Sequence, residues 1–385
     1  MLRSFRLTNH RSFAAEQELS LLPVYDREQL ALPVAAIYGA NASGKSNLLD
    51  GLAFMRDAVL DSFQRWDAEG GVPRTPFRLD PALRTQPSGY VVDVVVDEIR
   101  YTYGFTVADD KVLEEWLYSY PEKKKRVLFE RLDGRIRFGS TVGSERAKLD
   151  LLYELTRPNA LFLSVAAQSE TDPVMLVYQW FRHALVLRKS LNIGRFPGTD
   201  PERKRMVVDL LTVADVGIRD IQFMEGGEHT APRLMFEHQG ADEWFDFTDE
   251  SAGTQSWVSL LPYAIDALET GKIMVIDEID ASLHPLLTAR LIGLFREPET
   301  NPHGAQLIFT TRDASLLGTA LGEEVLARDQ IWFVEKDRGG ASRLYPLSDF
   351  KPREGENRER RYLGGSYGAV PVVSATGFAD AVREG

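Results

Sequence analysis

Residues 34 to 47 read VAAIYGANASGKSN, and this stretch decides the fold. From Gly39 to Ser46 it matches the pattern G-x-x-x-x-G-K-[ST], in which glycines let backbone N–H groups turn toward phosphate oxygens. The apolar run from 34 to 38 is typical of a buried parallel strand. Behind the loop, apolar residues recur at spacings of three and four, which predicts a helix that begins where the loop ends: Leu48, Leu52, Met55, Val59 and Phe63.

A strand, a glycine-rich loop and a helix in this order predict a binding site for ATP and Mg²⁺. The helix N-terminus carries a partial positive charge that favours an anion, and the loop N–H groups add to it. We expect Lys45 to reach the β- and γ-phosphates and Ser46 to ligate Mg²⁺. The loop residues predicted to bind the nucleotide are Gly39, Ala40, Asn41, Ala42, Ser43, Gly44, Lys45, Ser46 and Asn47.

A second buried strand is predicted far downstream, where the apolar residues 273–276 precede two acids. Such a strand delivers carboxylates to the edge of the sheet where α/β folds bind their ligands. Asp277 is predicted to lie on the Mg²⁺ side, and Glu278 to act as the general base that polarises the attacking water. Acids at a strand end can also be surface or capping residues, so the combination with Lys45 is what predicts an ATP phosphohydrolase.

The composition narrows the class of protein. The chain has 385 residues, 44% of them hydrophobic, which is enough for one large or two ordinary domains. It has no cysteine, which excludes disulfides and thiolate metal sites. No apolar run reaches the roughly 20 residues of a membrane-spanning helix, and the first residues alternate instead of forming a signal core. We therefore expect a cytoplasmic protein that does not contact a membrane.

The formal net charge of −12 bears on nucleic-acid partners. Binding to nucleic acid would need a local basic patch, because the overall field repels phosphates. Three stretches concentrate Lys and Arg: 123–126, 182–205 and 351–361. Ordinary solvated faces explain such clusters as well, so the net charge does not indicate a nucleic-acid partner.

Residues 249 to 256 read DESAGTQS, directly before a helical pattern. The motif resembles the signature motif of ABC ATPases. In that family the Ser and Gly at the start of the helix contact the γ-phosphate of an ATP held by the other subunit. The resemblance thus implies that Ser251 and Gly253 bind nucleotide across a homodimer or higher oligomer. An N-capped helix would explain the motif taken alone, and its position shortly before Asp277 strengthens the resemblance.

Two further segments are similar to ABC-type heads. Residues 279–285, IDASLHP, resemble the D-loop, which crosses the dimer interface in that family. Family members usually end the next strand, here predicted at 307–311, with a switch histidine. This chain has Arg312 there, whose guanidinium could contact phosphate without titrating. The departure leaves the identity of the phosphate sensor open.

The N-terminus resembles the opening strand and turn of SMC- and RecF-like heads through Phe5, Leu7, Asn9, Arg11, Ser12 and Phe13. This likeness implies a nucleotide contact for Arg11. Gln168 ends the apolar run 161–167 and stands where such heads place the Q-loop glutamine. The resemblance implies that Gln168 contacts both the nucleotide and Mg²⁺, although a glutamine at a strand edge would explain it equally well.

Taken over its whole length, the chain resembles the AbiLi-type bacterial ATPases. The likeness rests also on the short motifs FRLD at 77–80, WLYSY at 116–120, FLS at 162–164 and YLGGSYGAVP at 362–371. It implies an ABC-type ATPase that dimerises around ATP and regulates a separately encoded effector in antiphage defence. The alternative is a DNA-repair or recombination head acting directly on DNA, which should show a basic groove.

The predicted fold class is α/β, an ABC/SMC-type P-loop ATPase head with a mixed central sheet, an antiparallel β-subdomain and a short helical arm. Residues 1–170 form the expected N-terminal lobe, with the subdomain at about 85–140, where apolar and polar residues alternate between turn signals. Residues 171–245 are the expected helical arm and connecting segment, 246–350 the C-terminal lobe and 351–385 the tail. No heptad series is sustained in the arm, which excludes a long coiled coil.

Overall fold

The computed structural model describes residues 1–385 except 27, 170–173, 189–199, 215–216, 225–232, 282, 322–323, 352–356, 372–382 and 384–385. Parts of the expected arm and tail, and Ser282 of the D-loop-like segment, therefore lie outside the described residues.

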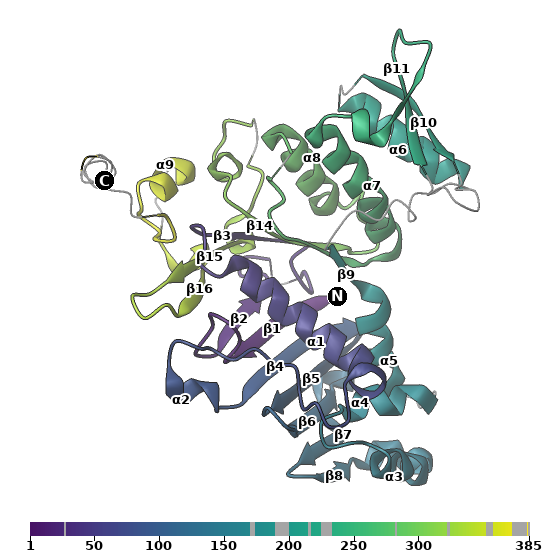
Figure 1. Cartoon of the computed structure of the whole chain (residues 1–385), viewed down its shortest axis with the longest axis vertical. Helices are drawn as coiled ribbons and strands as arrows, with labels where there is room; N and C mark the ends of the chain where they lie inside the picture. The colour runs from purple at the N-terminus through teal and green to yellow at the C-terminus, as the bar shows by residue number, and fades with distance from the viewer. Residues whose placement is uncertain are drawn as a thin grey trace.

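The strands of the described chain form three sheets (Figure 1). The antiparallel sheet runs, in spatial order, through β2 (Gln17–Ser20), β1 (Leu2–Thr8), β4 (Ser88–Val96), β5 (Ile99–Val107), β6 (Val112–Ser119), β7 (Arg126–Leu132) and β8 (Arg135–Phe138). The central sheet runs through β16 (Ser342–Pro346), β15 (Ile331–Lys336), β3 (Val34–Tyr38), β14 (Gln306–Thr311), β13 (Ile273–Ile276) and β9 (Leu185–Arg188). The small sheet contains β10 (Ile218–Met224), β11 (Arg233–His238) and β12 (Trp244–Asp246).

The described helices connect and cover these sheets. They are α1 (Lys45–Arg65), α2 (Pro81–Arg84), α3 (Arg146–Glu154), α4 (Phe162–Ala166), α5 (Val174–Gln179), α6 (Pro201–Val213), α7 (Ala252–Thr270), α8 (Pro285–Arg296) and α9 (Arg358–Leu363). A π-helical turn, η4 (Trp180–Ala184), follows α5, and short 3₁₀ turns are η1 (Pro121–Lys123), η2 (Ser140–Glu145), η3 (Ala167–Ser169), η6 (Phe247–Asp249), η7 (Ala314–Leu317), η8 (Arg328–Gln330) and η9 (Leu347–Asp349).

The central strand β3 is buried on both faces. It pairs in parallel with β14 on one side and with β15 on the other. Its alternate residues Ala35 and Ile37 belong to the core shared with α1 and the antiparallel sheet, whereas Tyr38 belongs to the core shared with α7 and α8. In Figure 1, α1 lies between the two sheets, and α7 and α8 lie on the opposite side of the central sheet. Two-sided burial explains why β3 reads as a continuous apolar run.

The antiparallel sheet confirms the alternating pattern predicted for about 85–140. Tyr90, Val92 and Val94 of β4 are fully buried, whereas the residues between them are partly exposed. The expected turn at Asp97-Glu98 has positive φ at both residues, 47° and 63°, as a tight hairpin between twisted strands requires.

One local prediction and one local alternative are wrong. Residues 171–245 were expected to form a helical arm and connecting segment, but Leu185–Arg188 forms β9, which pairs in parallel with β13. The apolar run before Gln168 is helix α4, which excludes the alternative of a glutamine at a strand edge. Short apolar runs cannot be assigned to helix or strand by periodicity alone, and here pairing with the central sheet decides. Together α6 and the small sheet form a lobe that projects at the upper right of Figure 1.

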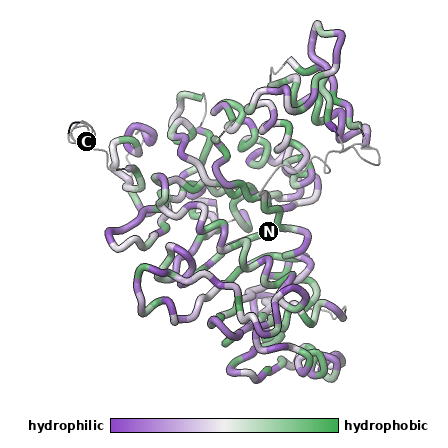
Figure 2. The backbone as a smooth tube through the Cα atoms, in the orientation of Figure 1, coloured by the Kyte–Doolittle hydropathy of each residue, from purple (hydrophilic) through white to green (hydrophobic). Residues whose placement is uncertain are grey.

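The α/β fold class is confirmed, with a mixed central sheet and a separate antiparallel sheet. Figure 2 shows the most apolar backbone segments in the central sheet, between the more polar outer elements. None of the described helices combines the length and hydropathy that a membrane-spanning segment needs.

Candidate active site

The phosphate loop, residues 39–44, is wound tightly against its neighbours. A Cβ atom on Gly39 would lie 2.4 Å from the carbonyl oxygen of Val334, and one on Gly44 would lie 2.3 Å from the Ser342 hydroxyl. Gly44 also has φ of +114°, a conformation that side chains strongly disfavour. Glycine is therefore required at both positions, as the motif predicts.

Lys45 lies at the floor of the loop with only 6% of its surface exposed. Its ammonium donates to the carbonyl oxygens of Gly39 and Ala40, at 2.7 and 3.0 Å, and so closes the loop on itself. Burial lowers the pKa of Lys45, and the nearby charge of Arg312 lowers it further. The N-terminus of α1 has no capping side chain and no acid in its first turn, which leaves it suited to an anion.

Thr310, on β14, fixes the two acids that follow β13. Its hydroxyl donates to Asp277 Oδ1 at 2.5 Å and accepts the backbone N–H of Glu278 at 2.7 Å. Glu278 adopts φ of 51°, which is unusual for a residue other than glycine. The structure thus brings Asp277 and Glu278 to the carboxyl edge of the sheet on which the loop lies, with their side chains exposed. Thr310 has no sequence signal beyond its place in an apolar strand.

Arg312 links the loop to the acids. Its guanidinium donates to Asn41 Oδ1 at 3.3 Å and lies 3.6 Å from Glu278 Oε1. Its backbone N–H reaches both carboxylate oxygens of Asp280 at 3.3 Å. Asp280 belongs to the D-loop-like segment. Arg312 therefore connects the phosphate loop with the acids at 278 and 280, which the sequence places far apart.

The groups present fit the triphosphate of ATP and a Mg²⁺ ion. Ser46 is exposed in the first turn of α1, and Asp277 is exposed at the same edge of the sheet. Among the described residues, no three His, Cys, Asp or Glu side chains gather into a metal site. That agrees with the usual way in which proteins hold Mg²⁺, through one or two protein oxygens together with substrate phosphates.

Comparison with known protein families shows to which family the chain belongs. Residues 34–318 match the family profile described as "AAA domain, putative AbiEii toxin, Type IV TA system". The match covers well over half of the chain. The chain belongs to this family of AAA domains.

Among solved structures, the AAA domain is similar to an Smc head bound to the C-terminal winged-helix domain of ScpA, with 14% identity and a TM-score of 0.47. That alignment covers 89% of this chain and 96% of the other. It is also similar to an Smc head with an extended coiled coil bound to the C-terminal domain of ScpA, from Pyrococcus furiosus. Identity there is 12% and the TM-score 0.46, over 90% of this chain and 97% of the other. No curated protein sequence matches the chain.

Arg11, which precedes the residues matched by the family profile, is paired within the fold. Its guanidinium donates to both carboxylate oxygens of Asp50, on the second turn of α1. His10 contacts the same carboxylate at 3.0 Å. Although burial alone would raise the pKa of Asp50, the hydrogen bonds from His10 and Arg11 lower it. Arg11 thereby holds the helix that carries the loop, and its expected nucleotide contact stays a prediction.

Gln168 lies at the wrong end of α1. Its side-chain oxygen accepts a hydrogen bond from Gln64 at 3.1 Å. Gln64 is 19 residues beyond Lys45, or about 28 Å along the helix at 1.5 Å per residue. The expected contacts of Gln168 with nucleotide and Mg²⁺ are therefore wrong. The apolar run before it folds as α4, which packs on α1 and carries the glutamine away from the loop.

Ser251 and Gly253 stand apart from the phosphate loop of their own chain. Ser251 caps α7, its hydroxyl accepting the N–H of Thr254 at 3.1 Å, and it is exposed. Within the described part of the chain, neither residue forms a hydrogen bond with the loop, Asp277 or Glu278. The side-chain amide of Asn47 donates to Ser12 at 2.7 Å.

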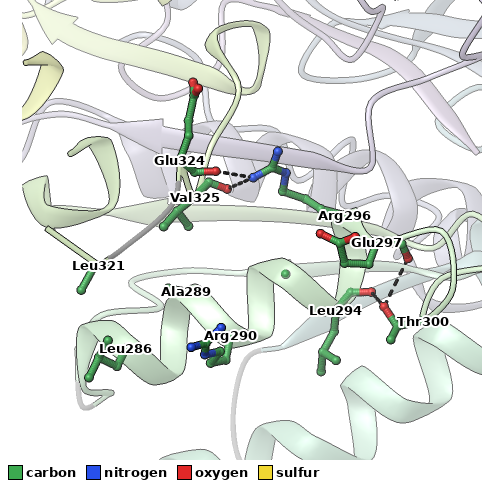
Figure 3. A pocket seen from close by; sticks show the side chains of 11 residues that line it. Leu286, Ala289, Arg290, Leu294, Arg296, Glu297, Thr300, Leu321, Glu324 and Val325 are labelled. Atoms are coloured by element: carbon green, nitrogen blue, oxygen red, sulfur yellow. Dashed lines mark hydrogen bonds between the residues drawn. The ribbon is translucent and has the colours of Figure 1, made fainter. Parts of the chain in front are cut away.

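A groove of about 450 Å³ follows the outer side of α8 in the AAA domain (Figure 3). One wall is closed by Arg296, which donates to the backbone oxygens of Glu324 and Val325 at 2.6 Å each. None of the predicted nucleotide-binding residues lines it. The candidate active site is thus defined by its donors and acids, and not by this hollow.

Proposed function

We propose that this AAA domain binds ATP with Mg²⁺ and hydrolyses it, and that two copies close around two nucleotides. In the cytoplasm this cycle would regulate a separately encoded effector in antiphage defence. One observation carries the proposal: Lys45, in a loop shaped for phosphate, and the acid pair after β13 lie at one sheet edge, linked by Arg312.

The proposed chemistry assigns one task to each group. The loop N–H groups and Lys45 bind the β- and γ-phosphates, and Ser46 with Asp277 holds Mg²⁺, which neutralises charge on the phosphate oxygens. Glu278 accepts the proton of the water that attacks the γ-phosphorus, while the bond to the bridging oxygen breaks and ADP leaves. Its exposed carboxylate and its fixed backbone suit this role.

Two features support the dimer and its biological setting. Ser251 is exposed at the N-terminus of the long helix α7. Among the described residues it forms no hydrogen bond with the phosphate loop of its own chain, which leaves it available to a nucleotide bound by a second copy. The family description refers to an AbiEii toxin and a type IV toxin–antitoxin system, and the sequence resembles phage-defence ATPases. Both favour control of a toxic or defensive effector.

The test measures Mg-ATP binding by calorimetry and phosphate release on the same protein samples. Lys45→Ala should abolish binding, because its ammonium is the charge within the loop. Glu278→Gln should bind ATP but release phosphate slower by a factor on the order of 10² to 10⁴, the usual worth of a general base. Glu299→Gln, an exposed acid after α8, is the matched control and should behave as wild type.

Three results would contradict the proposal. Wild-type protein that fails to bind Mg-ATP would contradict the proposed ATP binding. Unchanged affinity in Lys45→Ala would contradict the assignment of the phosphate loop. Normal phosphate release by Glu278→Gln would move the base elsewhere, with Asp280 as the next candidate.

A further inference from the structure

A chain of hydrogen bonds lies behind the phosphate loop and reaches residues that the family match does not include. The Asn47 amide lies 2.7 Å from Ser12 Oγ, which lies 2.8 Å from Ser342 Oγ. Ser342 Oγ in turn lies 2.5 Å from the carbonyl oxygen of Ser43 in the loop. Ser12 and Ser342 are both buried, and both lie outside the matched residues 34–318.

The donor and acceptor capacities of these groups limit how the hydrogen bonds can run. The carbonyl oxygen of Ser43 can only accept, and the amide nitrogen of Asn47 can only donate. Each hydroxyl has one proton to give. Ser342 Oγ lies within donating distance of both Ser12 Oγ and the carbonyl oxygen of Ser43, and Ser12 Oγ accepts from Asn47. The contact with Ser43 is the shorter of the two, so we assign the single proton of Ser342 to that carbonyl.

The hydrogen bond from Ser342 to the carbonyl oxygen of Ser43 sets the orientation of one peptide group. In a trans peptide the C=O and the following N–H point in opposite directions. Because Ser342 holds the carbonyl of Ser43 on the outer side of the loop, the N–H of Gly44 is turned to the inner side. Within the described chain this N–H has no hydrogen-bond partner. It is one of the groups that such loops offer to the α- and β-phosphates.

We propose that Ser342 is a positioning residue for nucleotide binding: it aims the Gly44 N–H at the phosphate through the carbonyl of Ser43. The proposal rests on the proposed ATP binding. Ser342 is the first residue of β16 and does not itself touch the ligand. Its own N–H donates to the carbonyl oxygen of Ser12 at 2.7 Å, which holds the hydroxyl in place.

The experiment compares the affinities of wild type, Ser342→Ala, Ser342→Thr and Ser12→Ala for Mg-ATP and Mg-ADP by calorimetry. Ser342→Ala should weaken both nucleotides by the same factor, about tenfold, the worth of one hydrogen bond to a charged group. Binding stoichiometry should stay at the wild-type value, because loss of folded protein lowers the stoichiometry and not the affinity. Ser342→Thr retains the hydroxyl and should recover most of the affinity. Ser12→Ala should cost less, since it leaves the bond to Ser43 intact.

Ser366→Ala, an exposed serine near the C-terminus, serves as the control and should bind as wild type. Wild-type affinity in Ser342→Ala overturns the positioning role, as does a Ser342→Thr variant as weak as Ser342→Ala. In both cases wild-type binding shows that the proposed function stands. Wild-type protein that binds neither nucleotide contradicts the proposed function and this inference together.

Discussion

Arg312 stands at the position where ABC-type heads usually have a switch histidine, a side chain that titrates near neutral pH. Arginine keeps its charge throughout the physiological range, whereas histidine loses it above a pKa of about 6.5. The guanidinium lies between Asn41 and the acids Glu278 and Asp280.

This difference can be measured in the rate of ATP hydrolysis. Arg312→His should make the rate fall as pH rises through about 6.5, because the histidine is cationic only below its pKa. Arg312→Lys retains the charge and should not gain this pH dependence. The measurement is the turnover number of each variant and of wild type from pH 5.5 to 8.5. Parallel profiles for wild type and Arg312→His would exclude a role for this charge.

At the same scale, the sequence predicted the residues whose spacing is dictated by chemistry. Gly39, Gly44 and Lys45 are fixed by the loop, and the acids follow an apolar strand. Thr310 and Ser342 were missed, because a hydroxyl in a buried strand has no sequence pattern of its own. Arg11 and Gln168 were placed by resemblance alone, and the fold gives them other partners. The roles of Ser251 and Gly253 stay predictions, since they require a second copy.

At the scale of elements, long periodic segments were predictable and short ones were not. The helix α1 and the long alternating strands β4, β5 and β6 follow from periodicities of 3.6 and 2. Strand β9 has four residues, and only its neighbour β13 makes it a strand. Such pairing is a long-range contact that local sequence does not record.

A buried acid joins two elements of the antiparallel sheet and its covering helix. Glu115, on β6, is fully buried and accepts the N–H groups of Phe162 and Leu163 at 2.6 and 2.9 Å. Tyr103 donates to it at 2.9 Å, and Arg131 lies at 3.5 Å. Burial raises the pKa of Glu115, opposed chiefly by the charge of Arg131. The carboxylate of Glu115 thus accepts hydrogen bonds from the N-terminal N–H groups of α4 and also pairs with the buried cation Arg131.

Removing this acid should destabilise the fold strongly. We expect Glu115→Ala to lower the free energy of unfolding by about 3–5 kcal/mol, since Arg131 is left as an uncompensated buried charge. Combined with Arg131→Met, the total cost should be less than the sum of the two single variants. Urea denaturation gives each value. Asp150→Ala breaks the exposed pair with Arg146 and is the control, expected to cost under about 0.5 kcal/mol. Equal costs for the two acids would refute the buried-charge explanation.

At the scale of the whole molecule, the proposed site is completed by a second copy. Each site would combine Lys45 and Glu278 of one chain with Ser251 and Gly253 of the other, which requires a two-fold pairing. Lys45→Ala and Ser251→Arg should each be inactive alone. Their mixture should regain phosphate release, because the heterodimer contains one site without either substitution.

Light scattering with Mg-ATP measures assembly in the same samples, and Glu278→Gln should accumulate as the dimer. A mixture in which dimers form without recovered activity would show that both nucleotides must be hydrolysed together. Wild-type protein that remains monomeric at saturating Mg-ATP and still hydrolyses it would rule out the shared-site mechanism.

The order of strands in the central sheet has a consequence for biosynthesis. The strand β3, which carries the phosphate loop, lies between β14 and β15, and these begin only at Gln306 and Ile331. During translation, β3 is synthesised early and cannot pair with either neighbour until most of the chain has been made. Ser342, which steadies the loop from behind, emerges later still. A chain that stops before Gln306 lacks both neighbours of the strand that carries the loop, and we expect such a fragment not to bind ATP.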